Sequence, residues 1–221
     1  MNIDEKSKRK REIVLKAVDE YIKTAQPITS GQLNLYFKDI SSATIRNELN
    51  MNDAYKYYNM AAENGRADAM VMMGLRYQMG NGVKVNMSKA KDYFERAAEK
   101  GNTNGEFYLG RCYYLGEGTT RNYDEAARLW TLAADKMFIP AVRGLGQCYY
   151  NGEGVEQNYQ EAFTLFEQAA SQGDYEAKYW LGVCYMNGEG TDKNIDKARE
   201  NLNAAMEMGN TEAEKLLNQI A

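Results

Sequence analysis

The stretch LGRCYYLGEGTTRNYDEAARLWTLAA, residues 109–134, decides the fold, because its pattern recurs along the chain at a fixed spacing of 36 residues. Four copies follow one another without an insertion or a deletion. In each copy a glycine comes first, and a large apolar residue follows 20 positions later: Gly74 and Phe94, Gly110 and Trp130, Gly146 and Phe166, Gly182 and Leu202. Repeats of about 20–50 residues are typical of solenoids, in which each unit buries its apolar face only against its neighbours.

The spacing of the apolar residues predicts two helices in each unit. Ala69, Met73 and Tyr77 of the first unit recur every four residues, which is the periodicity of an amphipathic helix, and the second half of the unit shows the same spacing. The Gly-x-Gly segment between the halves favours a turn, since glycine adopts left-handed backbone angles at little cost. An asparagine then precedes each second helix as its expected N-cap: Asn86, Asn122, Asn158 and Asn194. We therefore expect an all-α fold.

One joint between units departs from the pattern. Gly101, Gly173 and Gly209 follow the second helices of three units, whereas Met137 holds the same position in the remaining unit. Pro140 comes three residues later, in what would be the first turn of the next helix, where proline is favourable. We expect a locally altered joint at this point.

The motifs L-G-x-x-Y-x-x-G-x-G and A-x-x-x-[FW]-x-x-A-A-x-x-G resemble those of the SEL-like repeat family of the tetratricopeptide superfamily. The resemblance covers residues 50–221 and implies an α-helical solenoid that acts as an adaptor for other proteins. In the register of the motifs, the array consists of a partial unit at 50–65, full repeats at 66–101, 102–137, 138–173 and 174–209, and a capping helix at 210–221.

Residues 1–49 do not fit the repeat. Residues 1–50 carry a net charge of +2, and the remainder of the chain carries −6. The apolar spacing and the serine caps of this segment predict three short helices behind a basic run, which is typical of a helix-turn-helix. The runs YIKTAQPITSGQL, residues 21–33, and SSATIRNEL, residues 41–49, are similar to the N-terminal domain of the heat-inducible transcription repressor family HrcA.

The HrcA resemblance implies a truncated helix-turn-helix at 1–49 that lacks the wing of that family. Its recognition helix would contact double-stranded DNA through Ser42, Ala43, Thr44, Arg46 and Asn47. The alternative is that the segment only caps the N-terminal end of the solenoid. Since no glycine or proline lies between residues 42 and 64, we also expect one continuous or barely kinked helix over that range.

One face of the predicted first helices varies from repeat to repeat and is rich in aromatic and arginine side chains. We call this set the first-helix row: Phe107, Arg111, Tyr114, Arg143, Gln147, Tyr150 and Tyr179. The family resemblance implies that the first helices line the concave side of the solenoid. Exposed aromatic residues in a row are typical of a partner-binding groove, and arginine favours carboxylates. We therefore expect a protein or peptide partner with acidic and apolar residues; the alternative is a solvated face with snorkelling tyrosines.

The composition argues against several other functions. The chain has no histidine, which removes the commonest general base and metal ligand. Cys112, Cys148 and Cys184 lie one repeat apart, too far to share a metal ion or form a disulfide, and so are expected to be buried free thiols. The Gly-x-Gly turns lack the Lys-Ser/Thr pair of phosphate-binding loops.

These observations predict a protein that is not an enzyme and that holds neither a cofactor nor a metal. The absence of a long apolar run speaks against a membrane span, and unpaired cysteines suit a reducing cytoplasm. We expect a cytoplasmic scaffold for protein–protein interaction, with a tether to DNA through residues 1–49 as an added feature. The alternative is a DNA-binding transcriptional repressor whose solenoid mediates dimerisation or senses a partner.

Overall fold

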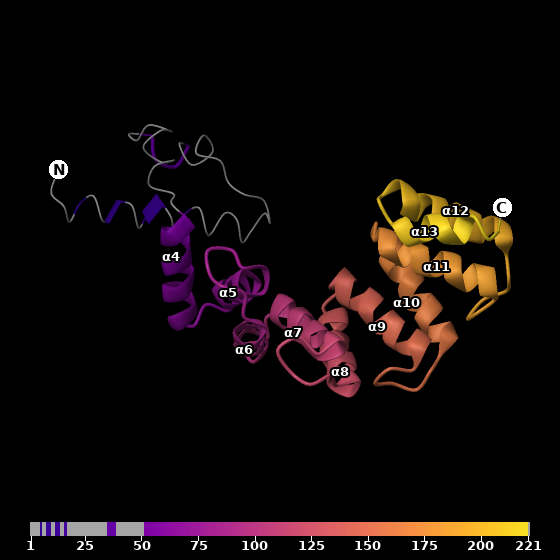
Figure 1. Cartoon of the computed structure of the whole chain (residues 1–221), viewed down its shortest axis with the longest axis horizontal. Helices are drawn as coiled ribbons and strands as arrows, with labels where there is room; N and C mark the ends of the chain where they lie inside the picture. Colours follow the sequence, from indigo (N-terminus) through magenta and orange to yellow (C-terminus); the bar gives the residue numbers. More distant parts are fainter. Residues whose placement is uncertain are drawn as a thin grey trace. The chain divides into compact units, whose positions relative to one another are not determined.

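The computed structural model describes residues 51–220, together with the isolated residues 5, 8, 9, 12, 13 and 16 and the segment 35–38. The regular structure of residues 51–220 is entirely α-helical (Figure 1). The helices are α4 (Met51–Glu63), α5 (Ala67–Met79), α6 (Met87–Ala98), α7 (Thr103–Leu115), α8 (Tyr123–Asp135), α9 (Ile139–Asn151), α10 (Tyr159–Ser171), α11 (Tyr175–Asn187), α12 (Ile195–Glu207) and α13 (Thr211–Leu217). The prediction of an all-α repeat fold is thus confirmed. In the part of the chain that the structure describes, no helix combines the length and apolar character needed to cross a membrane.

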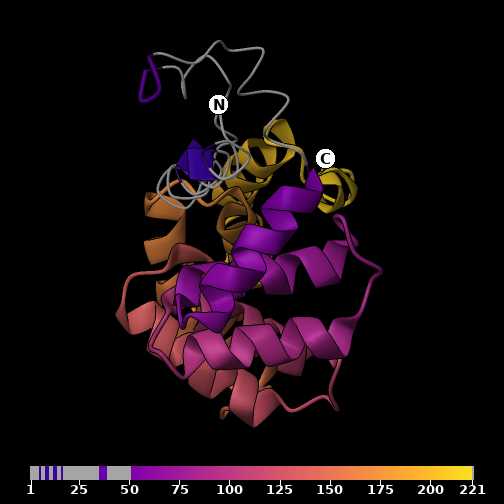
Figure 2. The same cartoon turned by 90° about the vertical axis from the view of Figure 1, so that its left-hand side faces the viewer.

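The helices alternate as the first and second members of each repeat, and they fall into two compact units. The first unit covers residues 1–105, where α4 packs on α5 and α5 packs on α6 (Figure 2). The second unit covers residues 106–221, where α8 packs on α9, α9 on α10, α10 on α11, α11 on α12 and α12 on α13 (Figure 1). The boundary between the units lies inside α7, so residues 106–115 of that helix belong to the second unit.

Every repeat uses the same contact at its core, in which a large side chain of the second helix lies directly against a glycine of the first. A Cβ atom on Gly74 would lie only 2.4 Å from the ring of Phe94, and one on Gly146 would lie 2.7 Å from Phe166. A Cβ atom on Gly110 would likewise lie 2.6 Å from Trp130, and one on Gly182 would lie 2.6 Å from Leu202. Only glycine permits this close approach of the two helices, because a protein core holds little free volume.

The asparagines act as predicted, and they also anchor the turns. The Oδ1 atom of Asn122 accepts a hydrogen bond from the backbone N–H of Glu125 at 3.1 Å, and Asn158 caps α10 through Glu161 in the same way. The backbone N–H of Asn122 donates to the carbonyl oxygen of Tyr113 at 2.9 Å, which ties the start of α8 back to α7. Asn86 and Asn194 make the equivalent pairs of bonds in their repeats. The N-cap prediction is therefore confirmed in all four repeats.

The sequence prediction of a locally altered joint at Met137 is wrong for the backbone. Gly101, Gly173 and Gly209 have φ angles of 72°, 87° and 98°, and Met137 adopts the same left-handed region with φ of 60°. It is the one non-glycine residue with a positive φ in the described part of the chain. The next helix, α9, has Pro140 in its first turn. The backbone of the repeat is thus kept at this joint although the glycine is missing.

Two sequence predictions concern residues that the structure does not describe. Helix α4 is described from Met51 onward, so a continuous helix from residue 42 to residue 64 is an untested prediction. The proposed DNA-contacting residues Ser42, Ala43, Thr44, Arg46 and Asn47 also lie outside the described residues. The three cysteines, in contrast, are described, and each is a buried free thiol as predicted.

Candidate interaction surface

The first-helix row lies on α7, α9 and α11, which are labelled in Figure 1. All seven of its residues belong to the second unit. Phe107, Arg111 and Tyr114 are three and four positions apart, so they lie along one side of α7. Arg143, Gln147 and Tyr150 repeat this spacing on α9. Each member of the row is partly exposed, neither fully buried nor fully open to solvent. The row is thus a half-buried strip that crosses successive repeats.

The aromatic members of the row rest on the core beneath them. The ring of Phe107 packs against Trp130 and Phe138, with ring centroids 6.4 and 5.2 Å apart, and the indole N–H of Trp130 donates to the carbonyl oxygen of Phe107 at 3.1 Å. Tyr150 packs on Trp180 with centroids 5.1 Å apart, and Trp180 also contacts Tyr179. These rings are therefore held in position before any partner binds.

Two tyrosines of the row join one repeat to the next. The hydroxyl of Tyr114 donates to Oε2 of Glu153 at 2.6 Å, and Tyr150 donates to Glu189 in the same way. Each glutamate lies in the Gly-x-Gly turn of the following repeat and also accepts a side-chain bond there, from Asn151 in the case of Glu153. We call these contacts the Tyr–Glu latches. The sequence analysis missed the two glutamates, although their recurrence between paired glycines was a visible signal.

The latches pair a neutral phenol with a charged carboxylate. Burial, followed by the hydrogen bond to Glu153, raises the pKa of Tyr114 well above its usual value, and burial with the bond to Glu189 does the same for Tyr150. Burial by itself would raise the pKa of Glu153. Hydrogen bonds from Tyr114, Asn151 and Tyr123 outweigh that effect, so the pKa of Glu153 is lowered. At neutral pH the carboxylate therefore accepts bonds from groups that keep their protons.

The two arginines of the row are in different electrostatic settings. Arg143 has its Nε atom 3.1 Å from the carboxylate of Asp174 and its NH1 atom 2.6 Å from Glu176, and its side chain is only 18% exposed. Arg111 is 40% exposed and lies 4.0 Å from its carboxylate neighbour Glu117. The charge of Arg143 is thus already neutralised by two carboxylates. The arrangement favours Arg111 as the contact for an acidic group on a partner.

The described residues hold no cluster of three or more His, Cys, Asp or Glu side chains that could bind a metal ion. Burial, and secondarily the charge of a nearby glutamate, raises the pKa of the Cys148 and Cys184 thiols to about 12. Thiols with such pKa values are poor nucleophiles and poor metal ligands, because the thiolate is the reactive form. The cysteines therefore act as small core residues.

The family comparison agrees with the repeat geometry. The family model of the Sel1 repeat matches residues 45–65, 67–102, 103–136, 139–174 and 176–210, which is most of the chain. The chain belongs to the Sel1 repeat family. The matched ranges follow the helix pairs, and the first range begins inside the segment 41–49 on which the HrcA resemblance depends. The comparisons do not support that resemblance or a helix-turn-helix at residues 1–49.

Two solved structures of Sel1-type proteins are similar to this chain. A Sel1 repeat protein from Oxalobacter formigenes is 32% identical with a TM-score of 0.72, and the match covers 77% of this chain and 68% of the other. A protective antigen of uropathogenic Escherichia coli strains, which displays an SLR fold, is 28% identical with a TM-score of 0.68. That match covers 86% of this chain but only 40% of the antigen. A comparison with the curated proteins finds no match.

Proposed function

We propose that this Sel1 repeat protein is a scaffold that binds a segment of another protein along the first-helix row. Sel1 repeat proteins generally act as scaffolds for protein–protein interaction, and the repeat accounts for most of this chain. The observation that carries the proposal is the partly exposed row of aromatic side chains, whose rings are fixed by Trp130, Phe138 and Trp180. Aromatic side chains held in place lose little conformational entropy on binding, which favours affinity.

The chemistry of the row favours a partner segment that carries both apolar and acidic side chains. Phe107 and Tyr114 on α7 and Tyr150 on α9 are each partly exposed, so each can offer part of its ring to a partner. Arg111 offers a guanidinium group that can donate two parallel hydrogen bonds to a carboxylate. Because Arg143 is engaged by Asp174 and Glu176, we assign the acidic contact to Arg111. Arg143 instead holds α9 against the start of α11.

A charge reversal at Arg111 tests the proposal. The Arg111→Glu variant should lose most of the capture of partner proteins from a lysate, measured by mass spectrometry after affinity purification, while its melting curve stays close to that of the wild type. Arg128→Glu is the matched control, because Arg128 is an exposed arginine on the second helix α8 that also pairs with a glutamate. Capture that is equal in wild type, Arg111→Glu and Arg128→Glu would refute a role for the row.

The remaining parts of the proposal extend the sequence predictions. We assign the protein no catalytic role, because the solenoids of this family are typically interaction scaffolds, and we assign it to the cytoplasm on the strength of its free buried thiols. A DNA-tethered form of the scaffold, or a repressor, depends on residues 1–49 alone. A gel shift with random duplex DNA at low and at moderate salt tests that form, and no shift at low salt would exclude it.

A further inference from the structure

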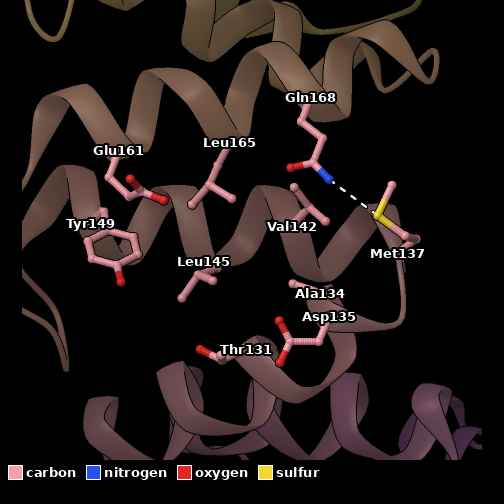
Figure 3. A pocket seen from close by; sticks show the side chains of 10 residues that line it. All are labelled: Thr131, Ala134, Asp135, Met137, Val142, Leu145, Tyr149, Glu161, Leu165 and Gln168. Atoms are coloured by element: carbon pink, nitrogen blue, oxygen red, sulfur yellow. Dashed lines mark hydrogen bonds between the residues drawn. The ribbon is translucent and has the colours of Figure 1, made fainter.

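A pocket with a volume of about 450 Å³ lies between α8, α9 and α10, and it shares no residue with the first-helix row (Figure 3). In Figure 3, α10 borders the pocket from above, α8 from below and α9 from behind. Its lining consists of Thr131, Ala134, Asp135, Met137, Val142, Leu145, Tyr149, Glu161, Leu165 and Gln168. All ten residues belong to the second unit. A volume of this size suits one or two large side chains of a bound peptide.

The floor of the pocket is apolar, and this is a property of one joint rather than of the repeat. Leu145 and Leu165 reach the floor with 7% and 9% of their surface exposed, and Val142 lies fully buried beneath them in the same hydrophobic core. In the following repeat the residues in register with Val142 and Leu165 are Lys178 and Asn201. An apolar floor of this kind stabilises a bound apolar side chain by removing it from water.

One wall of the pocket is the side chain of Met137. Met137 is 58% exposed and keeps a left-handed backbone conformation that the glycines of the other joints adopt more easily. The amide nitrogen of Gln168 lies 3.4 Å from the Met137 sulfur and connects this wall to α10 (Figure 3). Met137 therefore places a flexible apolar side chain at the edge of the pocket, although its backbone conformation is strained. Methionine adapts well to varied binding partners.

The rim of the pocket is negatively charged. Asp135 from α8 and Glu161 from α10 border it on two sides, and the ten lining residues, all in the described part of the chain, include no lysine or arginine. In the next repeat the positions of Asp135 and Glu161 are held by Ser171 and Lys197, so the acidic rim is again particular to this joint. The charge of the rim complements a cationic partner.

We propose that this pocket binds a segment of a partner protein that carries one or two large apolar side chains flanked by lysine or arginine. The apolar side chains would contact Met137 and the exposed edges of Leu145 and Leu165, beneath which Val142 lies fully buried. The flanking cations would pair with Asp135 and Glu161. This second site differs in chemistry from the first-helix row, which favours acidic segments, so the two surfaces favour different partners.

A peptide array identifies the expected chemistry without knowledge of the natural partner. The array carries short peptides in which two Leu or Met residues are flanked by Lys or Arg, beside versions with Glu in place of the cations and Ala in place of the apolar residues. The full-length protein should bind the basic and apolar peptides and neither altered version. Fluorescence polarisation with the strongest peptide then gives its affinity for the wild type and for each variant.

The variants take the residue that the neighbouring repeat has in the same register, so the fold tolerates them. Glu161→Lys should weaken binding by about fivefold or more, since it replaces an attraction by a repulsion. Met137→Gly should weaken binding without lowering the melting temperature, since it removes the wall while relieving the backbone. Glu167→Lys, an exposed charge change on α10 outside the pocket lining, and Arg111→Glu in the row are the controls and should leave the affinity unchanged.

Each other outcome overturns the proposal. Failure of every basic and apolar peptide to bind, or binding that Glu161→Lys and Met137→Gly leave intact, would show that the pocket is not the site. Preferential binding of the acidic peptides would place the contact elsewhere on the protein. Self-association that Met137→Gly abolishes, measured by sedimentation, would assign the pocket to a second copy of the chain instead.

Discussion

The α8–α9 and α10–α11 joints have the same backbone and different side chains. Met137 and Gly173 both adopt left-handed φ angles, and their N–H groups donate to the carbonyl oxygens of Ala134 and Ala170 at 2.7 and 3.0 Å. The residue that follows each of them donates to the alanine one position earlier, at 3.1 and 3.2 Å. The conserved geometry shows that the packing of the repeat sets the path of the chain, even where the local residue is unfavourable for it.

The side chains at the two joints have opposite consequences. At the second joint Asp174 caps α11 by accepting the N–H of Ala177 at 2.8 Å, and it also pairs with Arg143. At the first joint α9 begins after Phe138, which makes no side-chain cap and packs its ring on Phe107 instead. One joint is therefore built for stability. The α8–α9 joint has a strained backbone at Met137 and no side-chain cap at Phe138, and it lies beside both the pocket and the row.

The largest expected effect on stability comes from removing the main packing contact across the α8–α9 joint. Trp130 is 4% exposed and contacts both Gly110 and Gly144, so it links the repeats on either side of that joint. Trp130→Ala should lower the free energy of unfolding by about 3–5 kcal/mol. Urea unfolding followed by circular dichroism measures the loss without depending on tryptophan fluorescence.

Leu202→Ala is the comparison for Trp130→Ala, because Leu202 occupies the same register near the end of the array. It packs on Gly182 and lies in a small cluster with Ala205 and Ala213. Its loss should cost less, near the lower end of the range of about 2–5 kcal/mol for such truncations. Equal losses in the two variants would contradict a solenoid in which each repeat depends on its neighbours.

A smaller loss of stability is expected from a change at the α10–α11 joint. Asp174→Ala removes the N-cap of α11 and one of the two carboxylates that hold Arg143, so it should cost about 1–2 kcal/mol in the free energy of unfolding. Thermal melts of this variant and of Asp192→Ala, an exposed change in a turn, give the measurement and its control. If Asp174→Ala costs no more than Asp192→Ala, the two joints do not differ in stability as their side chains indicate.

At the α8–α9 joint, a substitution that relieves the backbone strain should instead raise stability. Met137→Gly places glycine where the backbone already has φ of 60°, and it should raise the free energy of unfolding by about 1 kcal/mol. Gly173→Met is the reverse change at the other joint and should lower stability by a similar amount, although a Cβ at Gly173 would meet no atom within 4 Å. Thermal melts decide the point. A loss of stability in Met137→Gly would mean that the Met137 side chain contributes more than the strain costs.

The sequence predicted the features that lie within one repeat and recur in each of them. The helix pairs, the asparagine caps and the burial of the three cysteines were all predicted from one chain, because each depends on spacing or on the preference of one residue type. The expectation of an altered joint at Met137 was wrong, because the packing of the repeat keeps the backbone on its usual path there. The apolar residues at the core also followed, since the large side chain and its glycine recur together in every repeat.

The sequence was less informative where two repeats meet. The ion pairs of Arg143 join positions 31 and 33 residues apart, and the latch between Tyr114 and Glu153 joins positions 39 apart. No spacing rule within one helix reveals such pairs. The pocket was missed for the same reason, since its lining comes from three helices and depends on which side chains face one another across the joint.

The smallest effect at neutral pH is expected from the Tyr–Glu latches, which are alike at the two joints. Tyr114→Phe and Tyr150→Phe should each cost less than about 1 kcal/mol at pH 7, because Asn151 and Asn187 still donate to the glutamates. The pKa of each tyrosine is raised in the folded state, so its contribution to stability is fully present below about pH 10 and is lost as the pH rises through the folded pKa.

The latches therefore predict a pH dependence that the phenylalanine variants should weaken. The melting temperature of the wild type should fall as the pH rises from 9 to 12, with Cys148 and Cys184 contributing because their pKa values are raised from 9.0 to about 12. Each single variant should lose an equal part of this fall above pH 10, and the share of the cysteines should remain. Tyr175→Phe, a change at an exposed tyrosine, is the control. If Tyr114→Phe reduces the fall and Tyr150→Phe does not, the two joints differ in their latches as well as in their caps, and the similarity of their backbones does not extend to the contacts between repeats.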